Sequence, residues 1–253
     1  MIDAGSLEFT YARIWARQAD AAGEALWRRI EITRDFDAAL EIVRASPLAR
    51  WLEGLGADVG AHAIERVMRR HWRERVAELA AWMPQSWQAA VQWCSVLIDL
   101  PALQHLAVGA APPRWMADDP IWHAVVTDGA AVGDAWQPLL TAAHTDVNSL
   151  LPRWQAEWDR RLPRGFGRDT LDEQLLPLLA DHAAAFAAPQ ASDGWALRHV
   201  LQRRLLLLLR RVLVEPAAAF IYLALCALEF ERLRGELLRR VAFSRGARES
   251  TTP

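Results

Sequence analysis

Lysine is absent from this chain of 253 residues, so each of its 29 basic side chains is an arginine. A phosphate-binding loop of the Walker type requires its lysine, and a Schiff-base enzyme requires one to bind its carbonyl substrate. The absence of lysine therefore excludes both kinds of site. A GC-rich genome explains this bias more simply than a functional requirement does.

Cysteine is almost as rare, with two residues in the whole chain. Cys94 and Cys226 both lie in apolar segments with helical spacing, which predicts small buried side chains rather than a disulfide framework. Such cysteine usage fits a reducing cytoplasm. The N-terminal residues contain the acidic Glu8 and no apolar block, so they do not resemble a secretory signal. We therefore expect a cytoplasmic protein.

The chain also lacks a strong charge of one sign and a long hydrophobic run. Its net charge of −2 provides no global basic field for nucleic acid or an anionic membrane. The most hydrophobic helix contains the apolar run Pro216–Leu228, which is about 13 residues long, whereas a membrane-spanning helix needs roughly 20. This run predicts a helix buried in a soluble core, with Phe220, Leu223 and Cys226 inside.

What the sequence does contain is helical periodicity. Nearly every segment has apolar side chains about 3.6 residues apart, and no stretch alternates with a period of two, so we expect an all-α fold without a β-sheet. Asp35 and Ser46 are placed to cap helices, and Pro47 follows at a first helical position. Asp99–Pro101 is expected to interrupt the helical segment that begins near Trp87. No low-complexity linker is long enough to separate two independent domains, so residues 1–253 are expected to form a single helical domain.

The helix expected at 61–83 has two distinct faces. Ile64, Met68, Trp72 and Leu79 are spaced to point inward. The other face carries Glu65, Arg66, Arg69, Arg70, Arg73, Glu74 and Arg75. Charged residues three or four apart on a helix commonly form ion pairs in solvent, so we expect this face to be a solvated surface of salt bridges.

Thirteen tryptophans are unusual for this length. Several of them, including Trp154 and Trp158, fall on helical faces and are expected to fill gaps between helices. Trp115 and Trp122 lie near helix ends instead. Because tryptophan is enriched in binding hot spots, these two are candidates for exposed contacts with a partner.

Residue patterns typical of catalysis are missing. The seven histidines are scattered and form no HExxH motif, so no metal site is expected. Asp118 and Asp119 stand near His123, but an exposed charged turn is the better explanation. Gly54, Gly56 and Gly60 follow a helix rather than a strand, unlike a dinucleotide fingerprint. We expect a protein without enzymatic activity, cofactor or small-molecule substrate, and a soluble helical enzyme is kept as an alternative.

In the C-terminal segment Ala196–Gly246, an apolar helix after a proline turn leads into an acid-rich turn and then into a leucine–arginine run. The residues of this pattern are Pro216, Phe220, Tyr222, Leu223, Glu229, Glu231, Leu233, Arg234, Leu237, Leu238, Phe243 and Gly246. With these residues the segment resembles the end of the C subunit of prokaryotic A/V-type rotary ATPases, the family that includes the d subunit of eukaryotic vacuolar ATPases.

The N-terminal region is similar to the same family. The matching residues are Tyr11, Ala12, Arg13, Phe36, Leu40 and the segment Ser46–Leu52, followed by the hairpin Ala61–Gly109 with Asp99 and Leu103 in register. Two features depart from the family. Ala102 and Arg232 stand where an asparagine is usual, and the middle of the chain, between Gly109 and Ala196, is shortened.

The resemblance implies a funnel-like array of pseudo-repeated helical lobes. The N-terminal lobe would cover about residues 1–109, a shortened middle lobe about 110–190, and the C-terminal hairpin about 196–246. In function, it implies a non-catalytic central-stalk adaptor that couples the soluble shaft of a V/A-type ATPase to the membrane rotor ring. Such a protein would be peripheral on the cytoplasmic face of the inner membrane, held through protein contacts.

The resemblance also places the partner interface at Glu231, Arg232, Arg234 and Arg239. Ordinary helix-surface pairs are the simpler explanation of these charges, with Glu231 bound to Arg234 and with Glu236 bound to Arg239 or Arg240. A stand-alone helical scaffold outside any ATPase is a further alternative, which the shortened middle favours mildly.

Overall fold

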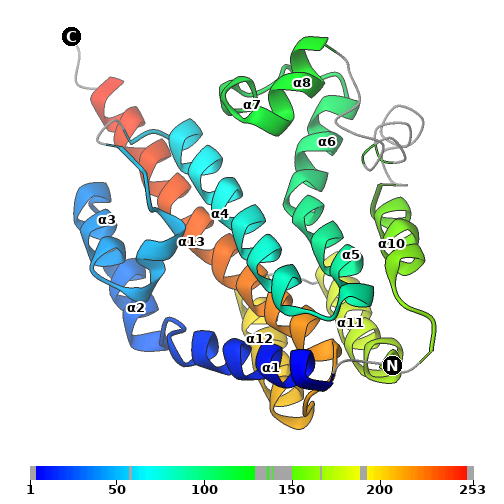
Figure 1. Cartoon of the computed structure of the whole chain (residues 1–253). Coiled ribbons are helices and arrows are strands. Elements are labelled where there is room, and N and C mark those ends of the chain that lie inside the picture. The colour runs from blue at the N-terminus through cyan, green and yellow to red at the C-terminus, as the bar shows by residue number, and fades with distance from the viewer. Residues whose placement is uncertain are drawn as a thin grey trace. The chain divides into compact units, whose positions relative to one another are not determined.

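The computed structural model describes residues 4–56, 59–128, 136, 139, 150–165, 167–188 and 193–249. Every regular element in these ranges is a helix, which confirms the all-α prediction (Figure 1). The elements are α1 (Ala4–Ala19), α2 (Glu24–Ile32), α3 (Phe36–Arg44), η1 (Pro47–Trp51), α4 (Ala61–Trp82), α5 (Gln85–Trp93), η2 (Cys94–Asp99), α6 (Leu100–Ala107), α7 (Arg114–Asp118), α8 (Pro120–Asp128), α10 (Leu150–Arg161), η4 (Leu171–Leu175), α11 (Leu176–Ala187), α12 (Gly194–Arg211) and α13 (Ala217–Glu249).

The chain divides into two compact units, and each combines segments that are distant in sequence. The first unit contains Met1–Asp20, Val76–Gln92 and Leu162–Arg232, and the second contains Ala21–Arg75, Trp93–Arg161 and Leu233–Pro253. Helices α4 and α13 therefore contribute one part to each unit. The lobes expected from the sequence follow the order of the chain instead, and both they and the funnel-like arrangement stay predictions.

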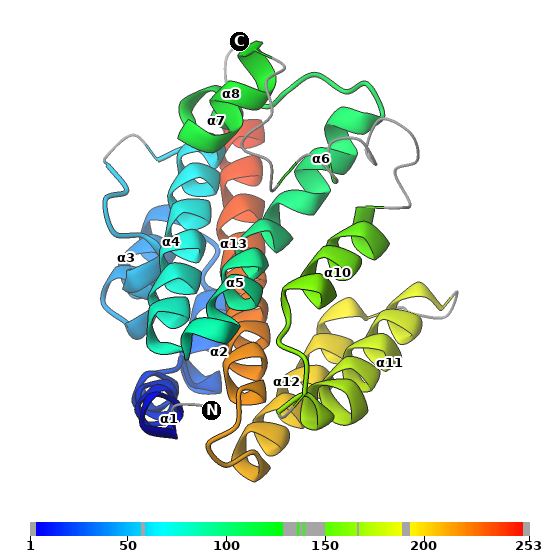
Figure 2. The ribbon, with the colours of Figure 1, turned by 45° about the vertical axis from the view of Figure 1, so that its right-hand side comes forward.

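The core of the first unit is built on the hairpin of α12 and the first half of α13. Leu201, Leu205, Leu208 and Leu209 give α12 a buried stripe at helical spacing. On α13, Phe220, Leu223 and Cys226 are buried, as the apolar run predicted. Helix α11 packs beside α12, as both ribbon views show (Figure 2).

The turn that joins α12 to α13 is fastened by the segment that precedes η4. The hydroxyl of Thr170 donates a hydrogen bond of 2.6 Å to the carboxylate of Glu215. Gly167 has a φ of +92°, and a Cβ placed on it would lie 3.1 Å from Pro216 and 3.2 Å from Trp87. A larger residue at this position would therefore be strained and crowded, so the close approach depends on glycine.

In the second unit, local capping follows the sequence-based expectations. The carboxylate of Asp35 accepts a hydrogen bond of 2.8 Å from the backbone N–H of Ala38 at the start of α3. The hydroxyl of Ser46 accepts one of 3.2 Å from Leu48, and η1 begins at Pro47. These contacts satisfy N–H groups that the first turn of a helix leaves unpaired.

The apolar faces of the two long helices are buried as predicted. Ile64, Met68, Trp72 and Leu79 of α4 are inaccessible to solvent, and so are Leu233 and Leu237 of α13. An element boundary falls at Asp99, as predicted, but the chain stays helical across it, and the α-helix after Pro84 already ends at Trp93. The 3-10 element η2 leads directly into α6, and Pro101 lies in the first turn of α6, where its missing N–H costs no hydrogen bond.

Within the part of the chain that the structure describes, no helix combines the length and the apolar character that spanning a membrane requires. The apolar segment of α13 is followed in the same helix by a charged half, which contains Arg232, Arg234, Glu236, Arg239 and Arg240.

Candidate functional site

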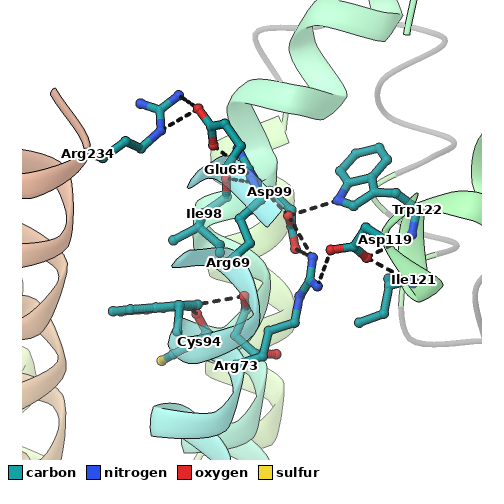
Figure 3. Close-up of polar contacts among 12 residues, drawn as sticks. Glu65, Arg69, Arg73, Cys94, Ile98, Asp99, Asp119, Ile121, Trp122 and Arg234 are labelled. Carbon is teal, nitrogen blue, oxygen red and sulfur yellow. Dashed lines mark hydrogen bonds and ion pairs between the residues drawn. The ribbon is translucent and has the colours of Figure 1, made fainter. Parts of the chain in front are cut away.

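The most prominent polar feature of the second unit begins on one face of α4. Glu65, Arg69 and Arg73 are each one helical turn apart, so they line up along the helix (Figure 3). Glu65 and Arg69 are buried and bind each other through Oε2 and Nε at 3.2 Å. The prediction that this part of α4 is a solvated surface is therefore wrong, because other elements of the unit cover it.

Asp99, at the end of η2, is the centre of this polar cluster. Its carboxylate has no exposed surface. Oδ1 of Asp99 accepts a hydrogen bond of 2.7 Å from Nη1 of Arg69 and one of 3.0 Å from the indole N–H of Trp122. Nη2 of Arg73 lies 3.3 Å from both oxygens of Asp99. Two arginines and an indole thus compensate one fully buried carboxylate.

Asp119 extends the cluster to helix α8. Its Oδ1 caps the helix by accepting hydrogen bonds from the backbone N–H groups of Ile121 at 3.0 Å and Trp122 at 3.2 Å. Its Oδ2 lies 2.6 Å from Nη1 of Arg73. The exposed charged turn expected at Asp118–Asp119 is therefore correct for Asp118 and wrong for Asp119, which is buried by its helix cap and its arginine.

Arg73 thus bridges two buried carboxylates. Burial by itself lowers the pKa of the Arg73 guanidinium, but Asp99 and Asp119 together raise the pKa by more, so it lies above its ordinary value. A guanidinium remains charged under all relevant conditions, and its planar fork suits it to bind several oxygens at once. Arg73 therefore acts as a permanent cation between η2 and α8.

The other end of the cluster reaches α13. Oε1 of Glu65 accepts a hydrogen bond of 2.7 Å from Nε of Arg234. Arg69 donates a further hydrogen bond of 2.7 Å to the carbonyl of Ile98, and its guanidinium lies 4.2 Å from the ring centroid of Trp115. The side chains form a continuous chain of alternating charge, which we call the six-charge network: Arg234, Glu65, Arg69, Asp99, Arg73 and Asp119.

Trp115 and Trp122 do not form exposed partner contacts, contrary to the prediction. Both are buried, and their rings meet edge to face with centroids 5.8 Å apart. The indole N–H of Trp122 binds Asp99, and the face of Trp115 receives Arg69. The sequence placed them near helix ends correctly, but these ends belong to the short helices α7 and α8, which pack on the six-charge network.

The six-charge network is suited to hold helices in register. Three arginines and three carboxylates compensate one another, and the indole and backbone groups satisfy further polar atoms. In the part of the chain that the structure describes, no group of three or more His, Cys, Asp or Glu side chains is placed to hold a metal ion. His144, one of the seven histidines, lies outside the described residues.

The four residues proposed for the partner interface all lie on α13, but their surroundings differ. Arg232 is buried, and Glu231 is half-buried. Arg234 is bound to Glu65. Arg239 is the most exposed of the four, with 52% of its side chain accessible, and it lies 2.9 Å from Glu236. The expected pairing of Glu236 with Arg239 and Arg240 is therefore confirmed, whereas the role of the four residues as an interface stays a prediction.

No protein-family model matches the sequence, and comparisons with curated proteins and with solved structures find no significant match. The family resemblance of the terminal segments therefore remains a hypothesis that depends on the residues that carry it.

Proposed function

We propose that this chain is a non-catalytic adaptor of a V/A-type rotary ATPase. In this proposal it couples the soluble, ATP-driven shaft to the ion-translocating ring in the membrane. It works at the cytoplasmic face of the inner membrane, where protein contacts hold it. It requires no cofactor, nucleic acid or small-molecule substrate.

The observation that carries the proposal is the position of Asp99. Asp99 and Leu103 are the acid and leucine that the resemblance brings into register with the family. Asp99 is also the residue at which Arg69 and Arg73 meet, and Leu103, one turn later, is buried. The residue that supports the family resemblance is thus the centre of the polar framework in the second unit.

Such a framework suits a protein that transmits torque. A protein that transmits torque must resist the sliding of one helix along another. Apolar contacts alone do not ensure this, because they are not directional. Charge-assisted hydrogen bonds have fixed geometry, so the six-charge network opposes a shift of α4 relative to η2, α8 and the second half of α13. The network also leaves its charged groups bound to one another rather than to a substrate.

Exposure selects Arg239 as the residue of choice for a test of the interface. Reversing the charge of Arg232 or Arg234 would disturb a buried side chain or the ion pair with Glu65, so a loss of binding would be ambiguous. Arg239 is half exposed and is not part of the six-charge network. Charges at the rim of an interface act mainly on the association rate and its salt dependence.

The experiment is co-purification with the shaft and ring proteins of the same organism. We expect the wild-type protein to bind both and Arg239→Glu to bind more weakly, with the difference largest at low salt, because salt screens exposed charges. Arg160→Glu on α10 is a matched control, because Arg160 lies 2.9 Å from Glu157 three residues earlier, and Arg161 binds the same glutamate. This arrangement repeats that of Glu236, Arg239 and Arg240.

The outcomes separate the hypotheses. If the wild-type protein associates with neither the shaft nor the ring, the adaptor proposal is wrong and a stand-alone scaffold takes its place. If Arg239→Glu and Arg160→Glu weaken binding equally, the charge of α13 is not a specific part of the interface. If binding is unchanged by both substitutions at every salt concentration, Arg239 is not part of the interface.

A further inference from the structure

Helix α12 has a charge composition that the rest of the chain does not share. It carries five arginines and no acidic residue, although the whole chain has a net charge of −2. Four of these arginines form two adjacent pairs, Arg203–Arg204 and Arg210–Arg211, and all four are exposed. The pairs are seven residues apart, about two helical turns, so they lie on the same side of the helix.

Apolar side chains accompany these arginines on the outer face of α12. The buried stripe of the helix lies in the core of the first unit, yet Val200 and Leu207 are 43% and 52% exposed. They too are seven residues apart, so they form a narrow stripe along the outside of the helix. Helical spacing puts one arginine of each pair on either side of this stripe.

The turn after α12 continues the apolar stripe. Leu213 is 67% exposed, and Val214 next to it is also exposed. Val214 has a φ of +54°, a left-handed conformation that is strained for a β-branched residue. The buried Pro216 and the bond from Thr170 to Glu215 hold the turn in place, so these two side chains are kept in solvent by the surrounding structure.

The arginine charges on this face are largely uncompensated. Arg204 lies 3.7 Å from Asp181 of α11, and both side chains are more than half exposed, so this pair is weak. Among the residues that the structure describes, Arg203, Arg210 and Arg211 have no ion-pair partner. We call the surface formed by Val200, Leu207, Leu213, Val214 and these four arginines the basic face of α12.

We propose that the basic face of α12 docks directly onto the surface of an anionic phospholipid bilayer. The four guanidinium groups would bind lipid phosphates, and the aliphatic side chains would enter the boundary between headgroups and acyl chains. A protein partner is less suited, because Leu and Val are under-represented in protein hot spots whereas aliphatic insertion into lipid needs no complementary shape. The proposal goes beyond the adaptor function and depends on α12 and its turn alone.

Vesicle flotation with the full-length protein tests this directly. At about 0.1 M salt, we expect binding to phosphatidylcholine vesicles with about 30% phosphatidylglycerol and little binding to phosphatidylcholine alone. Binding should fall steeply at about 0.5 M NaCl, because the Debye length shrinks from about 10 Å toward roughly 4 Å. Inorganic phosphate at the same ionic strength should not compete. If the wild-type protein does not bind anionic vesicles, or binds phosphatidylcholine vesicles equally well with and without phosphatidylglycerol, the proposal is wrong.

The variants distinguish binding through the basic face of α12 from binding through positive charge anywhere on the protein. Each arginine near an anionic surface contributes about fivefold to the partition coefficient, so Arg210→Gln with Arg211→Gln should lower it by roughly 25-fold. Leu213→Ser should weaken binding even where salt already screens the charges. The matched control is Arg28→Gln with Arg29→Gln, an exposed arginine pair on α2. If the control loses as much affinity as the α12 variant, the basic face is not the docking surface.

Lipid vesicles contain neither the shaft nor the ring, so the result is independent of the adaptor proposal. A protein that co-purifies with the shaft and ring but ignores anionic vesicles would support the adaptor function and contradict lipid docking. A protein that binds vesicles through α12 but neither of those partners would do the reverse. Thermal unfolding of each variant, monitored by circular dichroism, would show that the substitutions leave the fold intact.

Discussion

The guanidinium of Arg240 lies at the carbonyl end of helix α2, where its Nε donates a hydrogen bond of 2.8 Å to the carbonyl of Thr33, 207 residues away. Its Nη2 donates further hydrogen bonds to the carbonyls of Ile30 and Glu31. The last carbonyls of a helix have no partner within the helix, and the helix dipole favours positive charge there. Arg240 of α13 thus binds the last carbonyls of α2 and joins the two helices.

A pair of adjacent arginines makes this contact testable. Arg239 and Arg240 both bind Glu236, but the side chain of Arg239 is 52% exposed and that of Arg240 is 4% exposed. Arg240→Gln removes the buried cation from the Glu236 carboxylate and from the carbonyls at the end of α2, so we expect it to lower the free energy of unfolding by about 3–5 kcal/mol. Arg239→Gln should change it by less than about 1 kcal/mol. Urea denaturation measures both, and similar losses would contradict this view of Arg240.

Asp99→Asn tests the six-charge network. The substitution keeps the size of the side chain but removes the charge that the buried Arg69 and the half-buried Arg73 share, so both guanidinium groups lose their common partner. We expect a loss of about 3–5 kcal/mol in the free energy of unfolding. Asp172→Asn makes the same chemical change in an exposed pair with Arg168 and should cost less than about 1 kcal/mol. A loss below about 1 kcal/mol for Asp99→Asn would show that the network adds little to stability.

The features that could be predicted from the sequence are those that local pattern determines. The caps at Asp35 and Ser46 depend on residues two or three positions away, and the burial of Phe220 and Leu223 follows from an apolar run without a polar side. The inward face of α4 also followed from its spacing. In each case the information lies within a few helical turns of the chain.

The six-charge network could not be predicted in this way. Helical spacing shows that Glu65, Arg69 and Arg73 share a face, but the elements that cover this face come from η2, α7, α8 and α13. A solvated charged face and a buried one therefore have the same local pattern. One signal was present, because Asp99 stands alone as an acid in the apolar segment Val96–Leu103, and an isolated acid in such a segment requires a cation when it is buried.

The left-handed conformation of Val214 leads to a prediction of increased stability. A β-branched residue in this region is strained by about 1–2 kcal/mol, whereas glycine adopts it freely but loses more entropy on folding. We expect Val214→Gly to raise the free energy of unfolding by about 0.5–1 kcal/mol in urea denaturation. Val212→Gly is the control, because Val212 is buried at a φ of −79° and should lose stability. A destabilised Val214→Gly would show that the valine side chain makes contacts that outweigh its strain.

The last prediction concerns the behaviour of the protein in alkali. Burial raises the pKa of the Cys94 thiol from its ordinary value of 9.0 to about 12. The folded state therefore holds this proton more tightly than the unfolded state does. The resulting stability is complete below about pH 9 and is lost as the pH rises from about 9 toward 12. The slope is about 1.4 kcal/mol per pH unit for one proton.

The absence of lysine makes this contribution measurable, because lysine side chains titrate near pH 10.4 and dominate the alkaline range of most proteins. We expect the free energy of unfolding in urea to decline between about pH 9 and pH 11 for the wild type and for Cys226→Ala, which keeps Cys94. Cys94→Ala should be less stable at about pH 8, because it removes a buried side chain, but its stability should decline less over the same range. If Cys94→Ala and the wild type decline in parallel, another group is responsible and the Cys94 thiol is not the one that titrates.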